Sequence, residues 1–61
     1  MKTNGIKLGD VVRLKSGGPD MTVISIDVHE LLTYARCTWF DENMVQQSSV
    51  LIVEALSVVS S

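Results

Sequence analysis

The stretch that decides the fold is residues 11–28, which reads VVRLKSGGPDMTVISIDV. Residues 11–15 alternate apolar and polar side chains from Val12 onward, which predicts a strand. Residues 16–20 give the strongest turn signal of the chain, because glycine permits positive φ and proline has no N–H to donate to a strand ladder. The β-branched run over residues 21–28 follows as a second strand, so a hairpin is predicted.

The predicted second strand changes phase part-way along its length. Met21 and Val23 fall on one face by alternation, whereas Ile24, Ile26 and Val28 fall on the other. A β-bulge near Val23-Ile24 explains this slip, and so does a strand that is covered on both faces. The sequence leaves both explanations open.

Another strand and its return are predicted beyond this hairpin. Residues 29–33 break the alternation without glycine or proline, which predicts a longer hairpin connection. Residues 34–40 alternate again and predict the third strand. A polar turn at residues 41–43 leads to residues 44–47, which are expected to return as a fourth strand.

The tail over residues 50–59 is ambiguous. Polar residues recur every three positions from Glu54 onward, which suits a helical turn, yet many of the apolar residues are β-branched. We expect an extended stretch to Val53, a single 3₁₀ turn around residues 54–56, and a short closing strand. The alternative is a ten-residue helix that is apolar almost all round.

These segments together predict an all-β chain, a small SH3-like barrel of four to five short strands with a short helical turn near the C-terminus. Closure of the barrel limits the exposed edges of so small a sheet. One domain is expected over residues 9–61, after a polar N-terminal lead-in over residues 1–8.

Composition narrows the classes of function. The chain has 61 residues and a mass of 6.7 kDa, too little for a deep enclosed active site or a separate cofactor domain. A net charge of −2 disfavours binding to nucleic acid. One cysteine and one histidine give neither an intramolecular disulfide nor a four-ligand zinc site. We expect no cofactor, no metal and no membrane segment, and a cytoplasmic protein.

Two blocks of sequence carry a family resemblance. Residues 9–23 read GDVVRLKSGGPDMTV, and residues 37–40 read CTWF. The chain resembles the YodC-like family, small bacterial and phage-borne proteins of uncharacterised function, over roughly its first two thirds. The C-terminal third departs from the family pattern, because residues 50–53 are more apolar than in its relatives. The resemblance implies a compact β fold and supplies no catalytic residue.

No residue pattern indicates catalysis. His29, the only histidine, falls in a predicted loop without a nucleophile arrangement beside it. Cys37 alternates with Ala35 and Trp39, so it is expected to be a small buried hydrophobic residue and not a reactive thiolate. The sequence therefore predicts that the protein is not an enzyme.

The glycine loop is a candidate anion site. Successive N–H groups around Gly17 and Gly18, next to Ser16, can form a concave nest, and Arg13 and Lys15 add positive charge. The loop lacks the spacing of a phosphate-binding P-loop. The alternative is a tight hairpin that uses glycine for its backbone geometry alone.

Exposed apolar residues indicate an interaction surface. Trp39 and Phe40 point to opposite faces of one strand, and we expect Trp39 inside and Phe40 at a surface or interface. Four consecutive apolar residues in the tail cannot all be covered by so small a fold. They are the candidate residues of an interface between copies, namely Val50, Leu51, Ile52 and Val53. A homo-oligomer is predicted, with a dimer as its simplest symmetric form.

The predicted function is that of a non-enzymatic interaction module that self-associates and binds a protein or peptide partner. An alternative is an oligomeric protein that sequesters an anionic, nucleotide-like small molecule, using the glycine loop with Arg13, Lys15 and Arg36. A weaker alternative is a nucleic-acid-binding barrel that uses the same cations, which the net charge disfavours.

Overall fold

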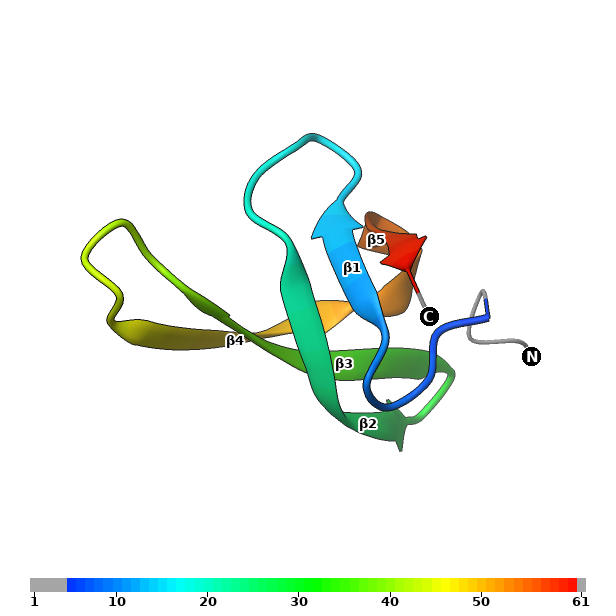
Figure 1. Cartoon of the computed structure of the whole chain (residues 1–61). Helices are drawn as coiled ribbons and strands as arrows, with labels where there is room; N and C mark the ends of the chain where they lie inside the picture. Colours follow the sequence, from blue (N-terminus) through cyan, green and yellow to red (C-terminus); the bar gives the residue numbers. More distant parts are fainter. Residues whose placement is uncertain (1–4, 61) are drawn as a thin grey trace.

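The computed structural model describes residues 5–60, which form a single five-stranded antiparallel sheet (Figure 1). The chain order is β1 (Val11–Leu14), β2 (Met21–His29), β3 (Leu32–Phe40), β4 (Gln46–Ile52), the 3₁₀ turn η1 (Val53–Ala55) and β5 (Leu56–Ser60). The order in the sheet is β4-β3-β2-β1-β5, so the first and last strands are neighbours. The predictions of an all-β chain and of a short helical turn near the C-terminus are confirmed. The alternative of a ten-residue helix over residues 50–59 is wrong, because these residues lie in β4, η1 and β5.

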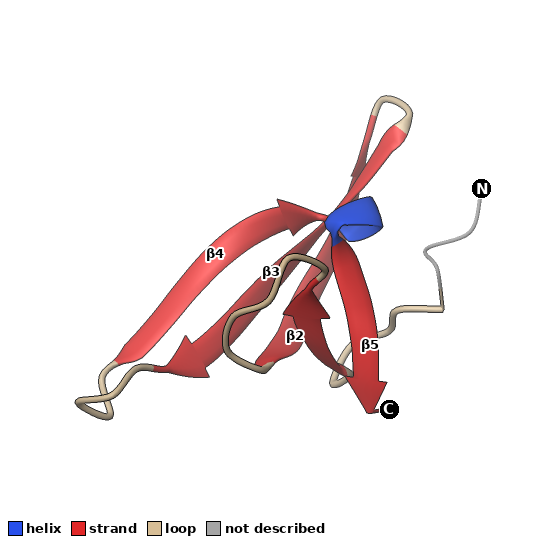
Figure 2. Ribbon diagram, turned by 90° about the horizontal axis from the view of Figure 1, so that it is seen from above, coloured by secondary structure: helices blue, strands red, loops and turns tan. Residues whose placement is uncertain are grey.

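The sheet is not closed into a barrel, which corrects that part of the prediction. Its two edge strands, β4 and β5, are not hydrogen-bonded to each other. In Figure 2, β4 arrives at η1, β5 leaves it, and the two strands diverge from this point. β2 and β3 have nine residues each, whereas β1 has four and β5 has five. Because the short strands cannot follow the β3–β4 hairpin along its length, the sheet stays open.

The core lies on the inner face of the sheet. Its centre consists of Val12, Val23, Ala35 and Cys37, one or two residues from each of three adjacent strands, all almost completely buried. Further buried residues of the core are Ile6, Met21, Val53 and Leu56, and Leu14, Ile26, Trp39 and Leu51 pack against it. The predicted faces of the first and third strands are therefore confirmed. Ile6 shows that the packed core begins within the predicted polar lead-in, of which residues 1–4 lie outside the described part, as does Ser61.

Of the two explanations left open for the phase change in the second strand, the β-bulge near Val23-Ile24 is the one confirmed. The register between β2 and β3 shifts between Val23 and Ser25, and Ile24 is half exposed at the shift. The bulge reverses the alternation of β2, because Val23 faces the core while Ser25 pairs with Arg36 on the outer face. Each residue after the bulge therefore points to the face opposite to the one expected from simple alternation counted from Val23.

The β2–β3 connection is shorter than predicted. His29 pairs with Leu32, so the turn contains two residues instead of the five over 29–33. Glu30 adopts φ +60 in this turn, a conformation that usually takes glycine. The sequence carried no glycine or proline signal for this turn, which is why its length was overestimated. The fourth strand is also longer than predicted, reaching Ile52.

A buried carboxylate attaches the N-terminal segment to the sheet. Asp10 is buried, and its Oδ2 accepts a hydrogen bond from the Lys7 backbone N–H at 2.9 Å. The backbone of Asp10 accepts from the Val23 N–H at 2.9 Å, and the Gly9 N–H donates to the Val23 carbonyl at 2.8 Å. These bonds hold the segment that brings Ile6 into the core.

We predict that Asp10→Ala lowers the free energy of unfolding by about 1–3 kcal/mol, because it leaves a backbone donor without its charged acceptor. Urea unfolding followed by circular dichroism measures this loss. Asp10→Asn retains an acceptor oxygen and is the matched control, for which a smaller loss is expected. Equal stability of Asp10→Ala and the parent chain would contradict this role for the carboxylate.

A second carboxylate organises the β3–β4 turn. Asp41 Oδ1 accepts hydrogen bonds from the backbone N–H groups of Asn43 at 2.9 Å and Val45 at 3.0 Å. Its Oδ2 accepts from Gln47 Nε2 at 3.0 Å. The bond from Val45, followed by that from Gln47, lowers the pKa of the Asp41 carboxyl from its ordinary value, because each favours the ionised form. Met44 completes the turn with φ +63.

The lowered pKa of Asp41 predicts a pH dependence of stability. The contribution is fully present above the ordinary aspartate pKa of about 3.9 and is lost as the pH falls through the lower pKa of the folded state. Asp41→Asn should therefore lose less stability than the parent chain between about pH 5 and about pH 2, measured by urea unfolding. Glu42→Gln changes a carboxyl that makes none of these bonds and should keep the parental pH dependence. An unchanged pH dependence in Asp41→Asn would refute the assignment.

Candidate functional site

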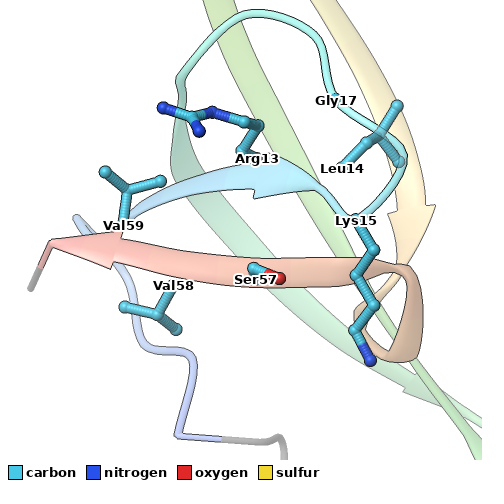
Figure 3. A pocket seen from close by; sticks show the side chains of 7 residues that line it. All are labelled: Arg13, Leu14, Lys15, Gly17, Ser57, Val58 and Val59. Atoms are coloured by element: carbon cyan, nitrogen blue, oxygen red, sulfur yellow. The ribbon is translucent and has the colours of Figure 1, made fainter.

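Two depressions mark the surface of the described residues as candidate sites. The first, of about 340 Å³, lies along β1 and β5 beside the glycine loop (Figure 3). Its lining residues are Arg13, Leu14, Lys15, Gly17, Ser57, Val58 and Val59. The second, of about 450 Å³, lies on the sheet face opposite the core and is lined by Asp27, His29, Tyr34, Arg36 and Val50.

Internal hydrogen bonds fix the glycine loop beside the first depression. The Gly17 N–H donates to the Leu14 carbonyl at 2.9 Å, and the Lys15 N–H donates to the Ala55 carbonyl at 2.9 Å. Gly17 and Gly18 both have positive φ, +109 and +122, so the loop needs glycine for its backbone geometry. The Gly17 N–H is therefore engaged within the chain and does not point to an external anion.

The cations around this loop do not converge on one point. Arg13 is paired with Asp20, with its Nε at 2.9 Å and its Nη2 at 2.8 Å from Oδ1 of the carboxylate. Figure 3 shows the charged ends of Arg13 and Lys15 pointing away from each other. Ser16 and Gly18 are not part of the lining. Of the residues predicted to form an anion nest, Arg13, Lys15 and Gly17 therefore line the same depression, but the charged ends of the two cations are not directed at one point in it.

Arg36 belongs to the second depression and is separated from the glycine loop. It lies on β3, opposite Ser25 of β2 and Val50 of β4. Its neighbour two residues earlier, Tyr34, lies opposite Asp27 and Ile52. Because directly paired residues of antiparallel strands point to the same side, all of these side chains share one surface.

We define the outer face as the surface of β2, β3 and β4 that points away from the core. It consists of Thr22, Ser25, Asp27, His29, Leu32, Tyr34, Arg36, Thr38, Phe40, Gln46, Ser48, Val50 and Ile52. Three apolar residues of this face are strongly exposed, with Leu32 at 42%, Val50 at 51% and Phe40 at 59%. The expected exposure of Phe40 is confirmed, and Trp39 packs against the core.

The four apolar tail residues are divided between the two faces, which corrects the predicted interface. Val50 and the partly buried Ile52 belong to the outer face. Leu51 packs against the core, and Val53 is only 1% exposed. Strand alternation directs Leu51 inward, and η1 places Val53 in the core. Val53 is therefore unavailable to a second copy, and Leu51 contributes to the core.

Sequence reasoning missed Asp27 and Tyr34 as site residues of the second depression, and it named Val50 only as a candidate for the interface between copies. Asp27, Tyr34 and Val50 come together with Arg36 only through the registers of β2, β3 and β4. Alternation within residues 34–40 does place Tyr34, Arg36 and Phe40 on one face. The position of Asp27 depends on the bulge, whose place in the chain was predicted but whose consequence for this residue was not.

The two residues considered for catalysis have different surroundings. Cys37 is fully buried, its thiol is 3.8 Å from the Ala35 carbonyl, and burial raises its pKa above the ordinary value. A thiol in this environment is kept in its unreactive protonated form. His29 is exposed at the end of β2, on the rim of the second depression.

Comparison with known protein families identifies the family of this chain. The family described as "Uncharacterized small protein (DUF2158)" matches residues 7–56. The chain belongs to the DUF2158 family. The DUF2158 match includes β1 to β4, η1 and every residue of the second depression, and it ends at the first residue of β5. No curated protein and no solved structure matches the chain.

Two kinds of feature are absent from the described part of this DUF2158 protein. Within residues 5–60, no helix is long and apolar enough to cross a membrane. The same residues contain no group of three or more His, Cys, Asp or Glu side chains placed to hold a metal ion.

Proposed function

We propose that this protein is a non-enzymatic interaction module that self-associates and binds a protein or peptide partner. The observation that carries the proposal is the outer face, where Leu32, Phe40 and Val50 are exposed and no element of the described chain covers them. A sheet in a small domain buries one face and leaves the other polar and solvated, or else buries both faces. Apolar residues of this size favour burial by another protein.

The centre of the outer face has the composition of a protein interface. Tyr34 and Arg36 are neighbours on β3, and tyrosine and arginine are among the residues that contribute most to binding energy. The depression of about 450 Å³ beside them offers space for a partner side chain. Phe40 extends the same face toward the β3–β4 turn.

Burial of this face favours association energetically. At about 25 cal/mol per Å², covering about 400 Å² of apolar surface contributes about 10 kcal/mol before the costs of association. Eight hydrophobic residues form the buried core of the described chain. For so small a core, a second layer against the outer face is a large additional stabilisation.

The open edge of β5 supports the peptide-binding part of the proposal. The strand reads LSVVS, without a charged residue or proline to block pairing. Its edge has no neighbouring strand, and the first depression lies beside it. An extended peptide that adds to a sheet edge uses this kind of surface.

The alternative functions receive less support from the geometry. Arg13 is neutralised by Asp20, Lys15 points elsewhere, and Arg36 lies in the other depression, so no cationic pocket for a nucleotide is assembled. The same dispersal argues against a nucleic-acid surface. Within the DUF2158 family, we propose that the chain is one of the YodC-like proteins, on the sequence blocks at residues 9–23 and 37–40.

We predict that the protein sediments as a dimer, at twice the chain mass of 6.7 kDa, as its concentration is raised to about 500 µM. The double variant Phe40→Ser, Val50→Ser should be monomeric under the same conditions, because it removes exposed apolar area from the outer face. Analytical ultracentrifugation measures both.

Leu8→Ser is the matched control for these substitutions, because Leu8 is an exposed apolar residue outside the outer face. This variant should associate like the parent chain. A parent chain that remains a 6.7 kDa monomer at every concentration would refute self-association.

A further inference from the structure

The outer face carries two opposite charges that form no ion pair with any of the residues 5–60. Arg36 on β3 and Asp27 on β2 are both exposed and both line the second depression. Asp27 pairs with Tyr34, and Arg36 pairs with Ser25, so the two charged residues are diagonal neighbours. The ion pair present among residues 5–60 is that between Arg13 and Asp20, on another part of the sheet.

The bulge in β2 is the reason that Asp27 lies on this face. Val23 faces the core, and in a regular strand Asp27, four residues later, would face the core as well. The register shift between Val23 and Ser25 reverses this alternation and places Asp27 beside Tyr34. One residue of extra backbone thus converts a core position into an exposed negative charge next to Arg36.

The charge of the outer face is self-complementary. Its other members are apolar or polar residues, apart from His29 at its rim, so Asp27 and Arg36 are its one carboxylate and its one guanidinium. In a symmetric dimer, a contact between residue i of one copy and residue j of the other occurs twice. One cation and one anion per copy therefore make two cross-pairs without an unmatched charge.

We propose that a second copy of this chain docks face to face on the outer face, with Arg36 of each copy opposite Asp27 of the other. This inference rests on the self-association proposed above and specifies its surface and its orientation. The axis that exchanges Arg36 and Asp27 runs obliquely to the strands, because the two residues are diagonal neighbours. The strands of the two sheets consequently cross at a large angle, as in orthogonal sheet packings.

The apolar residues of the face fit this arrangement. Tyr34 is paired with Asp27 on β2 and lies two residues before Arg36 on β3. Val50 on β4 is paired with Arg36. Both would be covered near the centre of the dimer, where charged pairs surrounded by apolar area are shielded from solvent. Phe40 lies farther along β3 and contributes at the periphery.

The size of the face limits the area that the dimer can bury. With nine residues in β3 and three strands across, the face measures about 30 Å by about 14 Å. This is at the low end of the area of specific interfaces, so a reversible dimer with a micromolar dissociation constant is expected. Pairing of two β5 edges is the competing arrangement, but it offers only a five-residue strand.

Charge reversal tests the proposal. Arg36→Glu and Asp27→Lys each place two like-charged pairs in the dimer, so each should raise the dissociation constant at least about tenfold. The double variant restores opposite charges with their positions exchanged and should return to within about threefold of the parent chain. Sedimentation equilibrium measures the constants, and circular dichroism with thermal unfolding checks that every variant is folded.

The controls carry the same charge changes elsewhere on the exposed surface. Lys15→Glu matches Arg36→Glu, and Glu42→Lys matches Asp27→Lys, and both should dimerise like the parent chain. Dimers that persist in the folded single variants, or a double variant that is not restored, would overturn the pairing while leaving self-association in place.

Two further outcomes identify other failures. A Val58→Lys variant places a charge on the β5 edge; if it alone dissociates the dimer, the copies pair through that edge and the face-to-face proposal is wrong. A parent chain that is monomeric at every concentration refutes the self-association on which the proposal rests. The supporting result is dissociation by both single reversals, recovery in the double variant, and dimers in all three remaining variants.

Discussion

The structure depends on one constraint, that a single open sheet can bury only one of its two faces. The inner face of this sheet contains the core centred on Val12, Val23, Ala35 and Cys37. Within residues 5–60, the segments outside the sheet form the turns, η1 and the N-terminal segment that brings Ile6 to the core, so none of them covers the outer face. The exposed Phe40 and Val50 are a consequence of this limit, and the proposed function follows from it.

The bulge in β2 links the packing of the core to the chemistry of the surface. On its N-terminal side, Val23 fills the core; on its C-terminal side, Ser25 and Asp27 face outward. The same irregularity therefore completes the hydrophobic core and positions the only carboxylate of the outer face. A surface property of the protein is fixed in this way by a backbone feature that also serves stability.

The charged residues at the glycine loop contribute to the fold itself. The pair formed by Arg13 and Asp20 joins the end of β1 to the end of the loop, and the Lys15 backbone bonds to η1. Gly17 and Gly18 supply positive φ to the same loop. The Arg13 side chain and the backbone N–H groups of Lys15 and Gly17 are thus engaged with the chain itself and hold the loop in place.

Local sequence patterns determined the strands, the glycine turn, the place of the bulge, the single 3₁₀ turn, and the separation of Trp39 from Phe40. These features follow from alternation, from β-branched residues and from glycine and proline, which act over a few neighbouring residues. Only the tertiary structure decided that the sheet stays open, that Val53 is buried, and that Arg36 adjoins Asp27 and not Lys15. These features depend on which strands pair and in which register, and register is set by contacts between segments distant in the sequence.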